Sequence, residues 1–138
     1  MARTLEVIGE RWTALIVRDA LLGITRFDDF HTSLGVPTNT LTKRLASLVA
    51  HGILARSNGE YELTRAGRDL DPVIRSLLAW GDQHRAPNGP PRLVHHRPCG
   101  TELDPLALFC STCEQTVSAR DIELRSGPGA RRSATRQH

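Results

Sequence analysis

A chain of 138 residues with 39% hydrophobic and 24% charged side chains has the composition of a folded protein, with one ordinary domain or one small domain and an appendage. No stretch approaches the ~18 consecutive apolar residues that a membrane-spanning helix requires, and the N-terminus does not resemble a secretory signal. We therefore expect a cytoplasmic protein without membrane contact, whose net charge of +3 is too small to identify a partner by itself.

The first part of the chain predicts three short helices separated by turn residues. Apolar residues at helical spacing indicate a helix over about 2–9 and a second over about 12–22, which Gly23 should end. Thr25 is suited to cap a third helix that ends at Gly35. Its inward-facing residues would be Phe27, Phe30 and Leu34. The second helix should form the centre of the core.

A fourth helix has two chemically different faces. Leu41, Leu45 and Leu48 recur at i, i+4 and i+7, which places them on one apolar face. The opposite, polar face carries Thr38, Asn39, Thr40, Thr42, Lys43 and Arg44. We expect Thr38 or Asn39 to cap the helix. The apolar face should pack against the core, and the polar face should remain accessible to a partner.

A short hairpin should follow this helix, which Gly52 ends. Two strands over 53–57 and 60–63 flank Asn58-Gly59, a dipeptide typical of a type I′ turn because both central residues need positive φ. A helix, a tight turn, a second helix and a hairpin follow one another as in a winged helix-turn-helix. The predicted fold class is therefore mainly α with a small β-hairpin wing.

The last helix of this domain should run from Thr64, a good N-cap, to about His84, with a kink at Pro72. Its apolar residues are Leu70, Val73, Ile74, Leu77, Leu78 and Trp80. This surface is wide for so small a domain. Packing within one subunit could cover it, but we expect this helix and the first helix to form a dimer interface.

Four blocks of sequence occur in this order: LEVIGERWTALIVRDALLG, RFDDF, the helix and hairpin over 37–63, and YELTRAGRDLDPVI with AWG. Together they resemble HxlR-type winged helix-turn-helix transcriptional regulators of the MarR-like superfamily. The resemblance implies a bacterial homodimer that binds a roughly palindromic operator in double-stranded DNA, with one helix in the major groove and the wing along the flanking backbone or minor groove. Many relatives carry a cysteine in a short N-terminal extension; this chain starts at the next stretch, so thiol sensing through that position does not carry over.

The candidate DNA-binding residues lie in the fourth helix, the wing and the start of the last helix. Cations expected at phosphates are Lys43, Arg44, Arg56 and Arg65. Candidates for base contacts are Thr38, Asn39, Thr40, Thr42 and Lys43. Asn39 and Lys43 are the foremost of these, and Asn58 at the wing turn completes the set. Each polar residue could instead cap a helix or face solvent, and Arg44 could pair with an acidic neighbour of its own subunit.

A different pattern begins near residue 94. His96 and Cys99 are separated by two residues, as are Cys110 and Cys113. This spacing is typical of a tetrahedral Zn²⁺ site, because each pair can direct its ligands to one ion, and thiolates and imidazole suit zinc. We predict a structural zinc ion on these four residues, with His95 as an alternative to His96. The cysteines could instead be free buried thiols, or Cys110 and Cys113 could form a redox pair.

The predicted domains follow from these patterns. Residues 1–86 should form the DNA-binding and dimerisation domain, 87–93 a linker, 94–126 a small zinc-ribbon-like β appendage, and 127–138 a disordered tail. Gly100 supports a knuckle turn after Cys99, whereas Glu114 stands where a second glycine would be expected.

The function expected from the sequence is transcriptional regulation rather than catalysis. The sequence has no phosphate-binding glycine loop and no nucleophile elbow. The expected partners are duplex DNA and a second copy of the chain, and no small-molecule effector is assigned. Two alternatives stay open: a zinc-ribbon adaptor that binds protein through 94–125, and a thiol-redox-responsive regulator that uses Cys110 and Cys113.

Overall fold

The computed structural model describes residues 1–91, 93–95, 98–104, 106–117 and 125. The chain divides into two compact units, Met1–Pro105 and Leu106–His138. The boundary falls inside the appendage predicted over 94–126, and the tail predicted over 127–138 lies outside the described residues. Within the described part of the chain, no helix is both long enough and apolar enough to span a membrane.

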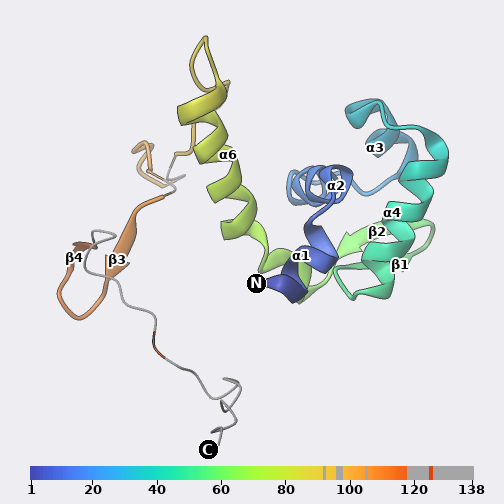
Figure 1. Cartoon of the computed structure of the whole chain (residues 1–138), viewed down its shortest axis with the longest axis horizontal. Helices are drawn as coiled ribbons and strands as arrows, with labels where there is room; N and C mark the ends of the chain where they lie inside the picture. Colours follow the sequence, from blue (N-terminus) through green and yellow to red (C-terminus); the bar gives the residue numbers. More distant parts are fainter. Residues whose placement is uncertain (92, 96–97, 105, 118–124, 126–138) are drawn as a thin grey trace, which may run out of the picture. The chain divides into compact units, whose positions relative to one another are not determined.

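The first unit is mainly helical and contains one antiparallel hairpin (Figure 1). Its elements are α1 (Ala2–Ile8), α2 (Arg11–Leu21), α3 (Phe27–Leu34), α4 (Thr38–Ala50), β1 (Leu54–Ser57), β2 (Glu60–Leu63), α5 (Arg65–Arg68) and α6 (Asp71–Arg85). This order agrees with a winged helix-turn-helix, in which α3 and α4 form the helix pair and β1–β2 forms the wing. The coarse fold prediction is confirmed.

The core lies where α2 meets α3, α4 and the wing. Ile16 and Val17 of α2 are fully buried. The predicted apolar face of α4 packs into the same core, with Leu41, Leu45 and Leu48 all at 0% exposure. Burial of one such leucine contributes about 1.5–3 kcal/mol relative to exposure, so this face fixes which side of α4 stays outside.

The expected helix caps were wrong for α3 and α4. Arg26 precedes α3, and no side chain caps that helix. Pro37 occupies the N-cap position of α4, and its carbonyl oxygen accepts a hydrogen bond from the Leu41 N–H at 2.9 Å. Proline holds the extended backbone that this position needs, with φ −55° and ψ 140°. Thr38 and Asn39 therefore lie in the first turn of α4 and are exposed.

The wing agrees with the prediction. Pairs run from Leu54 opposite Leu63 to Ser57 opposite Glu60, which leaves Asn58-Gly59 as a two-residue turn. Asn58 has φ 52° and Gly59 has φ 78°, as a type I′ turn requires.

The single helix predicted over 64–84 is two helices. Thr64 caps the short α5, because its hydroxyl oxygen accepts the Gly67 N–H at 3.1 Å. Asp69 and Leu70 separate this turn from α6, and Pro72 lies in the first turn of α6. Proline lacks an N–H and clashes with the carbonyl four residues earlier, so it begins a new helix here instead of kinking a continuous one.

The described part of the second unit is a small antiparallel hairpin of β3 (Leu108–Cys110) and β4 (Gln115–Val117). Cys110 pairs with Gln115, so Cys113 lies in the connecting turn. Leu108 and Phe109 are exposed. Burial of apolar side chains therefore contributes little to this hairpin.

Candidate nucleic-acid interface

The outer face of α4 presents polar side chains to solvent. Asn39 and Lys43 are both exposed, and their spacing of four residues places them on the same side of the helix. Thr42 is exposed too, but its hydroxyl donates to the Thr38 carbonyl oxygen at 2.9 Å. Thr40 is half-buried. Asn39 and Lys43 thus keep their polar atoms available to an external partner.

Arg44 has a partner within its own subunit. Its guanidinium forms an ion pair with the carboxylate of Glu10, which immediately precedes α2. The Arg44 side chain is half-buried, and its Nε has no hydrogen-bond partner among the described residues. This is the intrasubunit pairing that the sequence left open. The ion pair links the outer edge of α4 to the start of α2.

The base of the wing is joined to the end of α4. The Thr64 hydroxyl, at the end of β2, donates to the carbonyl oxygens of Gly52 and Ile53 at 2.5 and 3.1 Å. The Thr64 N–H also donates to Ile53 O at 3.1 Å. Gly67 packs so closely here that a Cβ would collide with Ile53 O and lie 2.8 Å from Leu63 Cδ2. The end of α4, the wing and α5 therefore meet at one junction around Thr64.

A second junction joins the wing to the start of α3. The Tyr61 N–H donates to Thr25 O at 2.7 Å, and Arg26 Nε donates to Glu60 Oε1 at 3.0 Å. The hydrogen bond to Glu60, then the charges of Glu60 and Asp29, raise the pKa of Arg26 above its ordinary value. The sequence analysis missed Arg26, because nothing local connects residues that are 34 positions apart.

Three of the predicted phosphate-binding cations have no carboxylate partner among the described residues. They are Lys43, Arg56 and Arg65, and all three are exposed. Arg56 lies over the ring of Tyr61, with its guanidinium carbon 5.3 Å from the ring centroid, and Asn58 is exposed at the wing turn. α4, the wing and α5 therefore each contribute one of these three exposed cations.

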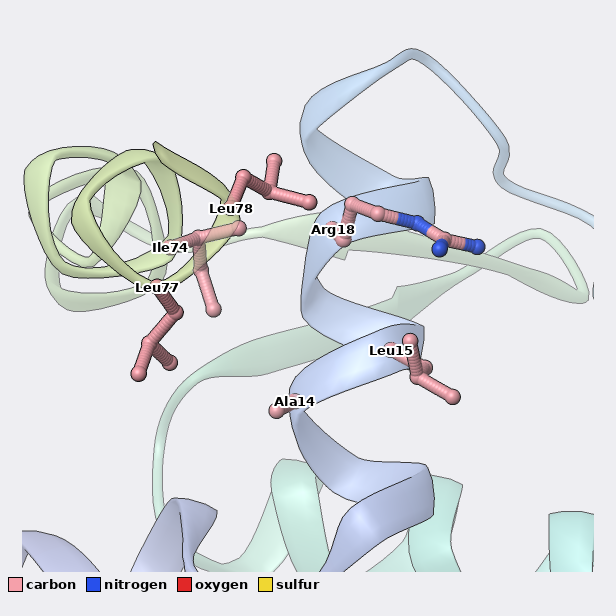
Figure 2. Close-up of a pocket in the computed structure, with 6 residues that line it drawn as sticks. All are labelled: Ala14, Leu15, Arg18, Ile74, Leu77 and Leu78. Atoms are coloured by element: carbon pink, nitrogen blue, oxygen red, sulfur yellow. The ribbon is translucent and has the colours of Figure 1, made fainter. Parts of the chain in front are cut away.

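The apolar face predicted on α6 is only partly covered. Ile74 is buried against α2, whereas Leu77, Leu78 and Trp80 are exposed. A pocket of about 130 Å³ lies between the two helices (Figure 2). Its lining residues are Ala14, Leu15, Arg18, Ile74, Leu77 and Leu78. Much of the apolar face of α6 is therefore exposed to solvent, at Leu77, Leu78 and Trp80.

Arg18 in this pocket compensates a buried charge. Its guanidinium is turned away from α6 in Figure 2 and donates to Asp19 Oδ1 at 2.7 and 3.0 Å. Asp19 is buried, and its other carboxylate oxygen has no hydrogen-bond partner in the described part of the chain. The sequence analysis did not single out this pair.

The predicted metal ligands are described only in part. Cys110 ends β3 and Cys113 lies in the β3–β4 turn, both as free cysteines, and His96 lies outside the described residues. The backbone N–H groups of Cys113 and Thr112, followed by the Cys113 thiol, hydrogen-bond to the Cys110 sulfur and lower the pKa of that thiol. The Cys99 Sγ lies 3.2 Å from Thr101 Oγ1.

The described residues contain no cluster of three or more histidine, cysteine or acidic side chains that could hold a metal ion. His95, the alternative ligand, is exposed, with Nδ1 3.1 Å from Gly100 O. The zinc ion stays a prediction.

Comparison with known proteins identifies the family. Residues 7–89, well over half of the chain, match the family model described as HxlR-like helix-turn-helix. The chain belongs to the HxlR-like helix-turn-helix family. The resemblance stated from four sequence blocks is confirmed.

Related sequences carry the same kind of description. This HxlR-like protein is 42% identical over 137 residues to uncharacterized HTH-type transcriptional regulators of Mycobacterium bovis and Mycobacterium tuberculosis, which covers 94% of this chain and 86% of theirs. The Bacillus subtilis regulator YybR is 32% identical over 90 residues, which cover 59% of this chain and 72% of that protein. The HxlR-like protein therefore belongs to a family of transcriptional regulators.

Solved structures share the fold. PA1607, a candidate transcription factor, matches with a TM-score of 0.77 and 35% identity over 91% of this chain and 93% of its own. PA1374 of Pseudomonas aeruginosa, also a candidate transcription factor, matches with a TM-score of 0.69 and 36% identity. The match covers 94% of this chain and 93% of PA1374. The redox regulator HypR, in its reduced form, matches with a TM-score of 0.55 and 30% identity. The match covers 62% of this chain and 92% of HypR. The first two matches extend beyond residues 7–89, so the C-terminal segment of the HxlR-like protein has counterparts in both structures.

Proposed function

We propose that this protein regulates transcription by binding a specific duplex DNA sequence as a homodimer in the cytoplasm. The observation that carries the proposal is the outer face of α4, where Asn39 and Lys43 are exposed on one side of a helix whose opposite side is fully buried. A helix held in this way can enter the major groove without rearrangement of its own core.

Sequence readout would depend on the first turns of α4. The Asn39 amide can donate to N7 of adenine and at the same time accept from its N6 amino group, and such bidentate contacts discriminate bases by about 1–3 kcal/mol each. Lys43, one turn later, can reach a guanine edge or a phosphate. Thr38, Thr40 and Thr42 would complete the surface that faces the bases.

Phosphate contacts would fix the position of the protein on the duplex. Lys43, Arg56 and Arg65 lie on α4, the wing and α5, which the Thr64 junction holds together. Each cation that neutralises a phosphate adds close to one unit to the dependence of log affinity on log salt concentration. Arg26 is committed to Glu60 and would act by holding the wing in place.

Dimerisation would cover the open apolar face of α6. Leu77 and Trp80 are more than half exposed. A two-fold symmetric contact would place the same face of a second copy against this surface, together with α1, where Leu5 is also exposed. Two copies related in this way would place two α4 helices on successive turns of the duplex.

Selection of bound duplexes from a random pool, at near-physiological salt, tests the function. We expect an enriched palindrome with half-sites about one helical turn apart. The variant Asn39→Ala with Lys43→Ala should lose more specific than non-specific affinity. A control that removes an exposed asparagine outside the helices, Asn88→Ala, should retain both. The absence of enrichment, or binding of protein through residues 94–125 without DNA binding, would favour the adaptor.

A redox-responsive form of this regulator is a second candidate, supported by the likeness to the redox regulator HypR. That likeness covers 62% of this chain, and the cysteines here, at 99, 110 and 113, lie beyond the family match over 7–89. Peroxide treatment tests this candidate, with DNA affinity as the readout. An affinity change that Cys110→Ser abolishes would support it, whereas unchanged affinity and unmodified thiols would remove it.

A further inference from the structure

Arg56 lies on the inner face of the wing, the face that packs on the core. In the register of β1 and β2, Arg56 is opposite Tyr61. The next pair on the same face is Leu54 opposite Leu63, because side chains alternate between the two faces of a hairpin. Leu54 and Tyr61 belong to the buried core, and Leu63 packs against it. Arg56 is exposed, so this face passes from the core to solvent at Arg56.

The two carboxylates of the wing belong to the opposite face. Glu60 and Glu62 flank Tyr61 in β2, and neighbours along a strand point to opposite faces. Glu60 is also paired with Arg26, whose Nε lies 3.0 Å from Glu60 Oε1. Among the described residues, Arg56 forms no ion pair with a carboxylate. The charge of Arg56 is therefore available to an anionic partner.

The ring of Tyr61 is a fixed platform for the Arg56 guanidinium. The guanidinium carbon lies 5.3 Å from the ring centroid, within the range of a cation–π contact. Tyr61 is 9% exposed, and its backbone N–H donates to Thr25 O at 2.7 Å, so both its side chain and its strand are held in place. A guanidinium that rests on an aromatic face keeps its N–H donors for other partners, and it loses less conformational freedom when it binds one.

We propose that Tyr61 is a positioning residue, which holds Arg56 in place to bind a phosphate of the DNA backbone. The inference rests on the proposed DNA binding. Removal of the ring would leave the charge of Arg56 unchanged but would free its side chain. DNA affinity should then fall by about twofold to fivefold, which corresponds to the free energy of an exposed cation–π contact. The dependence of affinity on salt should stay that of wild type, because Arg56 still reaches the phosphate.

A double-mutant cycle on the full-length protein tests the proposal. The probe is a short duplex of random sequence, because phosphate contacts do not depend on sequence. Tyr61→Leu should weaken binding by about twofold to fivefold in the wild-type background, but by less than about twofold in the Arg56→Ala background. Tyr61→Phe keeps the ring and should restore wild-type affinity. Lys43→Ala, on α4, is the control second site, and its effect should add to that of Tyr61→Leu.

The outcomes of the cycle separate this inference from the proposed function. Equal losses from Tyr61→Leu with and without Arg56 would overturn the positioning role and leave DNA binding intact. Wild-type protein that binds no duplex would overturn both.

A measurement on free wild-type protein keeps the test independent of misfolding, since Tyr61 is part of the core. The ring current of Tyr61 should shift the side-chain proton NMR signals of Arg56 upfield from those of Arg65, and Tyr61→Phe should keep this shift. Arg56 signals at the positions of a freely moving arginine would overturn the proposal.

Discussion

Helices α4 and α6 have similar apolar periodicity but different surroundings. Leu41, Leu45 and Leu48 of α4 are fully buried, whereas Leu77 and Trp80 of α6 are 56% and 52% exposed. The difference teaches that periodicity predicts the presence of an apolar face and not what covers it. The core of the subunit covers the face on α4. The face on α6 meets α2 at Ile74 and otherwise remains open, which is the basis for proposing a second copy as its partner.

The largest effect should come from breaking the covered face. Leu45→Ala removes a fully buried side chain and should lower the free energy of unfolding by about 3 kcal/mol. Leu22→Ala makes the same substitution at a residue that is 62% exposed, and it should change the free energy of unfolding by less than about 0.5 kcal/mol. Urea denaturation of the variants measures both values. Equal losses would contradict the assignment of α4 to the core.

A glycine pair tests the backbone packing of α5 against that of α6. Gly67→Ala should lower the free energy of unfolding by about 2 kcal/mol, because the added methyl group collides with Ile53 O at the base of the wing. A Cβ added at Gly81, on α6, has no atom within 4 Å. Gly81→Ala should therefore raise the free energy of unfolding by about 0.5 kcal/mol, because alanine has the higher helix propensity. Thermal unfolding followed by circular dichroism distinguishes these opposite signs, and a neutral Gly67→Ala would contradict the tight junction.

The open face of α6 can be disrupted without damage to the core. Leu77→Glu should raise the dissociation constant of the proposed dimer at least tenfold, equivalent to about 1.4 kcal/mol, because it places a charge in the apolar interface. Leu22→Glu is the matched control and should leave the oligomeric state unchanged, because Leu22 is exposed and lies outside the α6 face. Sedimentation velocity over a range of concentrations measures the equilibrium. A Leu77→Glu protein that remains dimeric would move the interface to another surface.

The smallest effect concerns the edge of α4. Glu10→Gln removes the charge that pairs with Arg44 and should lower the free energy of unfolding by less than about 1 kcal/mol, because both side chains are partly solvated. Arg44→Ala should cost a similar amount if Arg44 acts mainly as an anchor. In that case the salt dependence of DNA binding by Arg44→Ala should match that of wild type. Arg56→Ala should instead reduce the slope of log affinity against log salt concentration by about one unit. A reduced slope in Arg44→Ala would instead place Arg44 at a phosphate.

Local signals accounted for most of the fold. The leucine spacing of α4 and the Asn58-Gly59 turn each involve neighbouring residues, and both predictions were confirmed. The caps of α3 and α4 were misassigned, because a threonine or asparagine near a helix start can cap it or lie within its first turn. The break before α6 was missed, because Pro72 is compatible with a kink or with a helix start, and only the tertiary structure decides between them.

The sequence predicted which polar residues of α4 face outward, but not the long-range contacts that hold the candidate interface in place. Exposure of Asn39 and Lys43 follows from the buried leucine face of α4. The pairing of Arg44 with Glu10 and that of Arg26 with Glu60 join residues far apart in the chain, and Gly67 is needed only because Ile53 approaches it. Such contacts depend on the packing of elements, which no local pattern contains.

The attachment of the wing at both of its ends has a mechanical consequence. The Thr64 junction holds the base of the hairpin to the end of α4, and the Tyr61–Thr25 hydrogen bond holds β2 to the start of α3. Helix α4 and the hairpin should therefore move together as one rigid body. In the proposed dimer, a signal that switches DNA binding would change the distance and angle between the two rigid bodies, and the internal structure of each would stay the same.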